Sequence, residues 1–208
     1  MRIDAELGRR LIEAMAATVE AHWQELTELD QAIGDGDHGA GMKRGFDAVL
    51  AEAGTLAGQK LPAALVSIGR MLVMSMGGAS GPLYGTFFME LGKALGETPD
   101  EDVDRAALAA GFSRALAAVA ARGKSQPGQK TLLDVLAPVS AALAQDGVDA
   151  AGIARIAAGA AEATVPMQAQ RGRAAFLGER SIGHMDPGAR SASLIIGAVC
   201  AVLEEEAA

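Results

Sequence analysis

The chain has 208 residues, of which 50% are hydrophobic and 21% charged, and this suits one folded domain with a full core and excludes a disordered chain. Its formal net charge of −8 argues against nucleic acid or an anionic membrane surface as a partner, because both are negatively charged. The single cysteine cannot form an internal disulfide, which is typical of a reducing compartment, and we expect a cytoplasmic protein with one domain over residues 1–208.

The spacing of apolar residues predicts an all-α fold. Aromatic residues make up only 3% of the chain, which argues against a β-sandwich or β-barrel, and alanine, the strongest helix former, is common. Leu7, Met15, Val19 and Leu26 share one apolar stripe, which predicts a long first helix. About eight helices are expected in all, the later ones near residues 41–53, 62–76, 82–95, 108–119, 132–143, 153–167 and 194–202. Short connections favour antiparallel neighbours.

Proline and capping residues mark several predicted boundaries. Thr98-Pro99-Asp100-Glu101 has the pattern of a capping box with proline at the first helical position. Ser80-Gly81-Pro82 and Asp186-Pro187 each combine a capping side chain with a nearby proline. Pro138 falls inside the helix expected over 132–143 and should kink that helix or delay its start.

An acidic, glycine-rich segment follows the first predicted helix. Asp30, Asp35 and Asp37 lie within eight positions, and no lysine or arginine lies between Arg10 and Lys43. Crowded carboxylates repel one another unless a cation joins them, and carboxylate oxygen is the ligand type of Mg²⁺ and Ca²⁺. Three carboxylates leave a Mg²⁺ ion short of ligands, which substrate phosphates often complete. The segment predicts a site for Mg²⁺ with a nucleotide or another polyphosphate, with a solvated acidic loop as the alternative.

Two neighbouring features could contribute to a phosphate site. His38 directly follows the acidic segment and could act as a structural histidine or as a hydrogen-bond donor to phosphate. The glycine-rich turn over 77–82 precedes a predicted helix, so its backbone N–H groups could face an anion, although glycine there could also serve close helix packing. No Walker A motif and no G-x-G-x-x-G motif occurs, which argues against the common nucleotide-binding sheet folds.

Positive charge gathers in two later segments. Residues 122–131 form a basic, glycine-containing connection before a predicted helix, and residues 171–190 contain Arg173 and Arg180. The second segment lacks helical periodicity and is long for a connection in a compact domain. It also contains Phe176 and Leu177, so we expect an ordered lid that these apolar side chains hold shut.

Four blocks of the sequence resemble one known family. They are L-D-Q-A-I-G-D-G-D-H-G (29–39), G-G-A-S-G-P-L-Y-G-T-F-F (77–88), R-G-K-S-Q-P-G-Q-K-T-L-L-D (122–134) and G-R-A-A-F-L-G-E-R-S-I-G-H-M-D-P-G-A (172–189). In this order, from the first predicted helix to the last, they are similar to the blocks of the nucleotide-binding L subunit (DhaL) of dihydroxyacetone kinase.

The resemblance implies an antiparallel barrel of eight helices with ADP or ATP at one mouth. It implies two Mg²⁺ ions held by Asp30, Asp35 and Asp37, bridged through the nucleotide phosphates, and no covalent catalytic residue. The implied nucleotide contacts are His38, Gly39, Ala40, Gly41, Ala79, Ser80, Gly123, Leu132, Arg173, Asp186, Pro187 and Gly188. Some relatives have a polar side chain at position 41, where this chain has glycine, so the implied contact at that position excludes a side chain.

The resemblance also implies phosphotransferase activity. The γ-phosphoryl group would pass to dihydroxyacetone on a separate K subunit, and the chain would be inert alone, with lid residues such as Arg180 near the K subunit. Because the chain has no K module, we favour ADP as a bound coenzyme that a phosphoenolpyruvate-dependent phosphotransferase-system protein rephosphorylates. The alternatives are an ATP-dependent kinase subunit for a triose or for another ketose such as a tetrose, and a non-catalytic Mg-nucleotide-binding regulatory module.

Overall fold

The computed structural model describes residues 3–97 and 103–207, and every regular element in these ranges is helical. This confirms the expected all-α class. In chain order the elements are α1 Ala5–Ile33, α2 His38–Ala51, α3 Ala53–Ala57, α4 Leu61–Ser75, α5 Ser80–Gly96, α6 Arg105–Gly123, α7 Leu133–Leu143, α8 Ala150–Glu162, the 3-10 helix η1 Arg173–Ser181, and α9 Pro187–Ala207.

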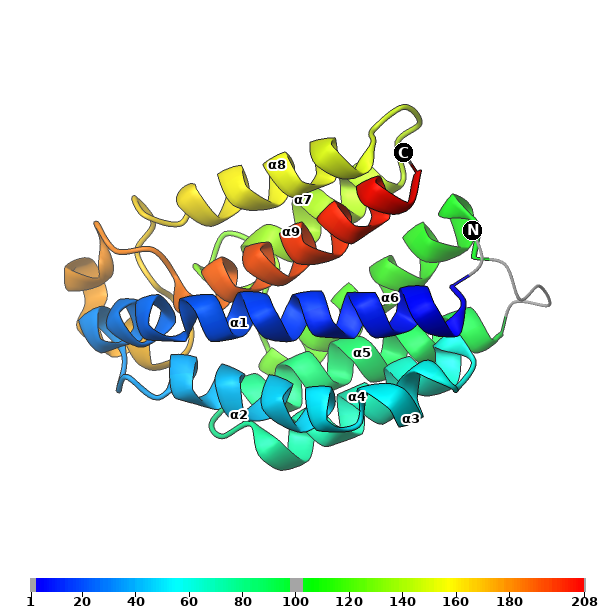
Figure 1. Ribbon diagram of the computed structural model, residues 1–208. Helices are drawn as coiled ribbons and strands as arrows, with labels where there is room; N and C mark the ends of the chain where they lie inside the picture. The colour runs from blue at the N-terminus through cyan, green and yellow to red at the C-terminus, as the bar shows by residue number, and fades with distance from the viewer. Residues whose placement is uncertain (1–2, 98–102, 208) are drawn as a thin grey trace.

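Eight of these helices close into a barrel (Figure 1). The ring runs α1, α2, α4, α5, α6, α7, α8 and α9, each helix packs on the next, and α9 packs back on α1. The short helix α3 lies against α1 and α4. Neighbouring helices of the ring run in opposite directions, so the first turns of α2, α5, α7 and α9 gather at one end. The expected antiparallel barrel of eight helices is confirmed.

The apolar stripes seen in the sequence fill the interior of the barrel. On α1, the side chains of Met15, Val19 and Leu26 are at most 5% exposed and lie in one core cluster. On α5, the ring of Phe87 packs edge-on against that of Phe112, with the ring centroids 5.0 Å apart. Full burial of a large apolar side chain stabilises a fold by about 1.5–3 kcal/mol, so these stripes hold the ring of helices together.

Some predicted helix boundaries shift. Helix α2 begins at His38, three residues before the expected start, so the glycine-rich segment after the acidic residues is itself the first turn of a helix. Helix α7 begins at Leu133 and continues through Pro138, so its start is not delayed. The capping box expected at 98–101 lies outside the described residues.

The expected long loop is partly helical. Helix α8 ends at Glu162, five residues earlier than predicted, and Thr164 turns its hydroxyl back to the carbonyl oxygen of Ala161. Pro166 follows closely, and a proline disfavours helical backbone in the residue before it. Helix α9 already begins at Pro187, and η1 lies within the segment that precedes it. Residues 171–186, which contain η1, are called the lid below.

One of the two capping predictions is wrong. Asp186 caps α9 as expected, because its Oδ2 accepts a hydrogen bond from the Ala189 N–H at 2.7 Å. Ser80 does not cap α5: the N-cap is Ala79, without a side-chain hydrogen bond, and the Ser80 hydroxyl turns to His38. No side chain therefore caps the start of α5, and its first backbone N–H groups are left for another hydrogen-bond partner.

Helix α9 is the one helix in the described residues that is long and apolar enough to cross a membrane by length and composition. It packs between α1 and α8 in the ring and buries Ser191 and Ser193. A helix that contacts two neighbours in a barrel can be as apolar as a membrane-spanning helix, because both of its contact faces are apolar.

Candidate functional site

Three carboxylates meet where α1 ends and α2 begins. Asp30, Asp35 and Asp37 each place an oxygen within 4.8 Å of the other two. Asp30 lies one helical turn after Leu26 on the buried face of α1, so its side chain is directed inward and is only 9% exposed. Gly36, with φ of +77°, makes the turn that brings the other two carboxylates back to it. The structure thus brings these three sequence-predicted residues together, and they are called the acidic cluster below.

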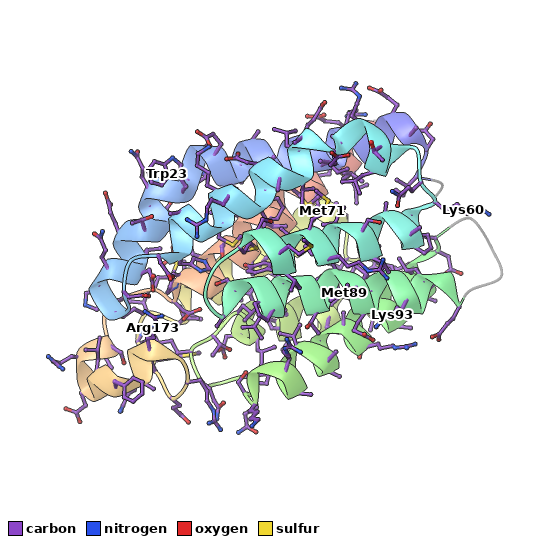
Figure 2. The ribbon with its side chains drawn as sticks, turned by 90° about the horizontal axis from the view of Figure 1, so that it is seen from below. Trp23, Lys60, Met71, Met89, Lys93 and Arg173 are labelled. Carbon is purple, nitrogen blue, oxygen red and sulfur yellow. The ribbon has the colours of Figure 1, made fainter. Side chains whose placement is uncertain are left out.

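The acidic cluster suits a hard divalent cation. Its donors are all carboxylate oxygens, the ligand type of Mg²⁺. The backbone N–H of His38 donates to Oδ2 of Asp30 at 3.1 Å and holds that carboxylate in place. Arg173 of the lid forms an ion pair with Asp35, so a cation already offsets part of the negative charge. Figure 2 shows Arg173 at this end of the barrel.

The acidic cluster adjoins the first turns of two helices. Helix α2 begins directly after Asp37, and α5 begins at Ser80. A Cβ added to Gly78, just before α5, would lie 3.6 Å from the Asp37 carboxylate. Backbone N–H groups at a helix start lack helical partners and favour an anion. Ala40 and Ala79 lie in these two segments, half-buried and exposed, so the site can offer cation and anion ligands side by side.

The ring of His38 faces the interior of the protein. It is 7% exposed, with Nδ1 2.9 Å from Oγ of Ser80 and Nε2 2.9 Å from Oγ of Ser191. Burial lowers the pKa of His38 to about 4, although the charge of Asp30 and the carbonyl of Pro187 act in the opposite direction. Both ring nitrogens already have protein partners, so the geometry favours the structural role for this side chain.

Two predicted contact residues, Gly39 and Gly41, differ in their surroundings. A Cβ on Gly39 would lie 2.0 Å from the carbonyl oxygen of Trp23 and 2.3 Å from Oγ1 of Thr27. Glycine is needed there because α1 and α2 approach so closely. At Gly41 the nearest atoms, which include Nη2 of Arg44, are 3.8 Å from such a Cβ, so a side chain would fit.

The third and fourth sequence blocks reach the same end of the barrel. Gly123 is the last residue of α6, and a Cβ added there would lie 3.4 Å from Cδ2 of Leu83 on α5. Leu132 is the N-cap of α7, and its Cβ is 3.6 Å from a Cβ added to Gly188 of α9. Pro187 is the first residue of α9. The predicted contact residues from distant blocks therefore gather around one mouth.

Asp186 connects α9 to the lid. Its backbone N–H donates to Oγ1 of Thr164 at 3.0 Å, and its carboxylate caps α9. Burial raises the pKa of Asp186 to about 7; the N–H of Ala189 lowers it, and the nearby charges of Asp134 and Lys130 act in opposite directions. This carboxyl group changes its charge near neutral pH, unlike an ordinary surface aspartate.

A buried lysine, which the sequence analysis missed, anchors the lid. Lys130 is 1% exposed, and its Nζ donates to the carbonyl oxygens of Met167 at 3.0 Å and Ser181 at 2.7 Å. Burial lowers the pKa of Lys130, and the charge of Asp186 raises it. The Lys130 ammonium thus joins the backbone just before the lid, at Met167, to the backbone within the lid, at Ser181. The only sequence signal was its position between a glycine-containing turn and the apolar residues that begin α7.

The expected apolar closure of the lid is wrong for one of its two residues. Phe176 is 89% exposed, whereas Leu177 is half-buried. Gly178, with φ of +56°, interrupts the 3-10 helix directly after them. Met185 of the lid packs against the core, and polar contacts hold the lid as well, among them the Arg173–Asp35 ion pair and the carbonyl hydrogen bonds of the buried lysine.

Tyr84 and Ser191 are two further residues that the sequence analysis missed. They are 5% and 1% exposed, and the phenol oxygen of Tyr84 lies 2.7 Å from Oγ of Ser191. Burial raises the pKa of Tyr84, so its phenol keeps its proton. Tyr84 is the single tyrosine of the chain and belongs to the second block, a signal that could have singled it out.

Comparison with known proteins agrees with the four blocks. Residues 32–201 match the family model of the DAK2 domain. The chain is 39% identical over 203 residues to the ADP-binding subunit DhaL of PEP-dependent dihydroxyacetone kinase 1 from Listeria innocua, which covers 96% of this chain and 97% of that protein. It is 42% identical over 173 residues to the ADP-binding subunit DhaL of PEP-dependent dihydroxyacetone kinase from Escherichia coli, covering 80% and 81%.

A solved structure shares the fold. The crystal structure of the dihydroxyacetone kinase from C. freundii, in complex with AMP-PNP and Mg²⁺, superimposes with a TM-score of 0.75 at 25% sequence identity. The match covers 94% of this chain and 34% of that chain, so this chain spans about a third of the length of that kinase.

Proposed function

The chain belongs to the DAK2 domain family, and from this premise we propose that it is the ADP-binding subunit of a dihydroxyacetone kinase. Its reaction is transfer of the γ-phosphoryl group to dihydroxyacetone bound on a separate K subunit. The observation that carries this proposal is the acidic cluster beside the first turns of α2 and α5. Such a transfer depends on positioning and charge neutralisation and needs no covalent protein nucleophile.

In this proposal, Asp30, Asp35 and Asp37 hold two Mg²⁺ ions that the nucleotide phosphates bridge. The metal supplies positive charge that offsets the charge on the phosphate oxygens. The N–H of His38 keeps Asp30 oriented, and Arg173 brings a further cation from the lid.

The nucleotide phosphates lie at the helix starts in this proposal. Gly39, Ala40 and Gly41 in α2, and Ala79 and Ser80 at α5, offer backbone groups to them. The remaining contacts come from the ends of α6, α7 and α9 and from the lid, through Gly123, Leu132, Arg173, Asp186, Pro187 and Gly188. The fit is supported by the packing of Leu132 against Gly188, which brings two of these segments together.

We infer further that ADP stays bound as a coenzyme and is rephosphorylated in place by a phosphotransferase-system protein. Slow release is required for this mode, and the lid supports it. Lys130 fixes the lid backbone, and Arg173 pairs with Asp35 across the mouth. Both relatives described above are named as PEP-dependent.

The K subunit completes the site by covering the mouth. Direct transfer to a sugar on another chain requires water to be excluded from the phosphoryl group. The lid, drawn in orange in Figure 1, lies at this end of the barrel, and its exposed residues, which include Phe176 and Arg180, are available for that contact. In this proposal, residues 1–208 form one domain that acts in the cytoplasm. Without the K subunit it phosphorylates no sugar.

The experiment begins with protein purified without added nucleotide. We expect denaturation to release close to one ADP per chain. Dihydroxyacetone phosphorylation is then measured with and without a K subunit, supplied either with ATP or with phosphoenolpyruvate and the phosphotransferase proteins. We expect turnover only with the K subunit and phosphoenolpyruvate. Nucleotide-free protein that turns over with ATP would indicate an ATP-dependent kinase subunit, and binding without any turnover would indicate a regulatory module.

A further inference from the structure

A buried chain of hydrogen bonds lies behind the acidic cluster. Nδ1 of His38 is 2.9 Å from Oγ of Ser80, and Nε2 of His38 is 2.9 Å from Oγ of Ser191. The phenol oxygen of Tyr84 lies 2.7 Å from the same serine oxygen. These side chains come from α2, α5 and α9. The hydrogen bonds therefore join three helices whose first turns meet at the mouth.

Ser191 determines the direction of these hydrogen bonds. A serine hydroxyl has one proton to donate and two lone pairs that accept. Oγ of Ser191 donates its proton to a backbone carbonyl oxygen of its own helix, that of Pro187 at 2.9 Å or that of Gly188 at 3.1 Å. Both lone pairs therefore accept, one from Nε2–H of His38 and the other from the phenol O–H of Tyr84, for which the Gly188 carbonyl oxygen is a more distant acceptor at 3.4 Å.

The same reasoning fixes the role of Ser80. A neutral imidazole carries one proton, so with that proton on Nε2 the Nδ1 atom of His38 is an acceptor. Ser80 is its partner and donates its hydroxyl proton to Nδ1. The oxygen of Ser80, at the half-buried first residue of α5, keeps lone pairs and has no further proton to offer.

We propose that Tyr84 and Ser191 are positioning residues that hold the proton of His38 on Nε2, so that Ser80 presents an acceptor oxygen to the nucleotide. The inference rests on the proposed function for the position of the nucleotide. An acceptor oxygen repels a bare phosphate oxygen and receives a hydrogen bond from water bound to a phosphate-complexed cation. The chain of hydrogen bonds thus favours the magnesium complex of ADP over free ADP.

The first test locates the proton without any nucleotide. Long-range ¹H–¹⁵N correlation spectra of the full chain at neutral pH report which ring nitrogen of each of the three histidines is protonated. A His38→Asn variant identifies the signals of His38. We expect the proton on Nε2 in the wild type and a shift towards Nδ1 in Ser191→Ala, where the acceptor for Nε2–H is removed. A wild-type proton on Nδ1 would overturn the inference.

The second test measures calorimetric affinity for ADP with and without Mg²⁺. Ser191→Ala should lower the preference for the magnesium complex about tenfold, Tyr84→Phe should lower it less, and Ser191→Thr should restore it. Ser193→Ala is the matched control, because Ser193 is also buried in α9 but donates only to the Arg190 carbonyl oxygen, at 2.8 Å. If Ser191→Ala fails to fold, Tyr84→Phe tests the same direction of hydrogen bonds.

Two results of the binding test would contradict the inference or the proposed function separately. Equal preferences for the magnesium complex in the Ser191→Ala and Ser193→Ala variants would overturn the positioning role. A wild-type chain with its proton on Nε2 that binds no ADP would overturn the proposed function and the statement about Ser80, while supporting the proton assignment.

Discussion

Arg173 of the lid and Asp35 of the acidic cluster form an ion pair across the mouth of the barrel. Their side chains are 60% and 35% exposed, and an ion pair this exposed contributes about 0–1 kcal/mol to the stability of a fold. The contact matters more for the lid, because it joins η1 to the segment between α1 and α2, far away in the sequence. Residues that stabilise the fold little can still control how fast a ligand leaves.

Replacing this arginine should affect nucleotide release more than folding. In Arg173→Gln we expect the free energy of unfolding to change by less than about 1 kcal/mol. The release rate of ADP, measured by displacement with a fluorescent analogue, should rise about tenfold or more. Arg180→Gln, which changes another exposed arginine of the lid, is the control. Equal release rates in the two variants would contradict the role of the ion pair.

The acidic cluster should hold its metal as one unit. Asp35→Asn and Asp37→Asn should each weaken ADP binding in the presence of Mg²⁺ by at least about tenfold, equal to about 1.4 kcal/mol. The fold should persist, because both side chains are exposed. Calorimetry with Glu28→Gln as a control tests this, since Glu28 is an exposed acidic residue of α1 outside the cluster. Unchanged ADP affinity in both cluster variants would reject the metal assignment.

Substitution should destabilise the protein at one glycine of α2 and have little effect at another. Gly39→Ala places a Cβ 2.0 Å from the carbonyl oxygen of Trp23, so α1 and α2 must separate, which costs about 1–3 kcal/mol. Gly41→Ala places a Cβ no closer than 3.8 Å to its neighbours and should leave stability nearly unchanged. Urea unfolding of both variants measures this difference. Similar destabilisation in both would show that the close approach of the helices is not the cause.

The exposed phenylalanine of the lid should matter to the complex rather than to the isolated chain. Phe176 is 89% exposed, so Phe176→Ala should change stability by less than about 0.5 kcal/mol and leave ADP release unchanged. The concentration of K subunit needed for half-maximal turnover should rise. Leu177→Ala is the comparison, since its half-buried side chain packs on the protein and its loss should speed release. Faster ADP release from Phe176→Ala would show instead that Phe176 helps to close the lid by apolar packing.

Protonation of His38 should make a destabilising contribution as the pH falls below 6.5. The pKa of His38 is about 4 in the folded protein and 6.5 in an unfolded chain. Between these values the unfolded chain binds a proton that the folded protein does not, so stability present above pH 6.5 is lost towards pH 4. The expected loss is about 3 kcal/mol.

The comparison with His38→Asn isolates this contribution. Asp186, whose pKa is raised from 3.8 to about 7, acts with the opposite sign over the whole of this range, but it acts equally in both proteins. In urea unfolding from pH 7.5 to pH 4.5, the wild type should lose stability relative to the variant as the pH falls. The same slope in both proteins would mean that His38 takes up its proton in the folded state.

Local patterns were enough to predict the eight helices of the barrel, although not α3 or η1. The stripe through Val19 and Leu26 predicted α1, and Asp186-Pro187 predicted the start of α9. Both signals act within one or two helical turns, where hydrogen bonds and periodicity are set by neighbours in sequence. The predicted start of α2 and the predicted end of α8 were wrong, because glycines and a polar turn there leave the backbone a choice that packing decides.

The acidic cluster was also readable from the sequence, because its residues lie within eight positions and one turn can bring them together. The orientation of the His38 ring could not be predicted from the sequence, because it depends on Ser80 and Ser191, which belong to two other helices. Similarly, the exposure of Phe176 follows from the positive φ of Gly178 and from the contacts of the lid, not from its apolar character.

The sequence by itself therefore determined the helical class, the order of the helices and the residues of the acidic cluster. It did so because periodicity, capping and crowded charge are properties of short segments. The tertiary structure alone decided that Lys130 is buried against the carbonyl oxygens of Met167 and Ser181, and that Tyr84, Ser191 and His38 share one chain of hydrogen bonds. Closure of the barrel brings these distant residues together, and a buried polar group must then find its partners among whatever the fold places beside it.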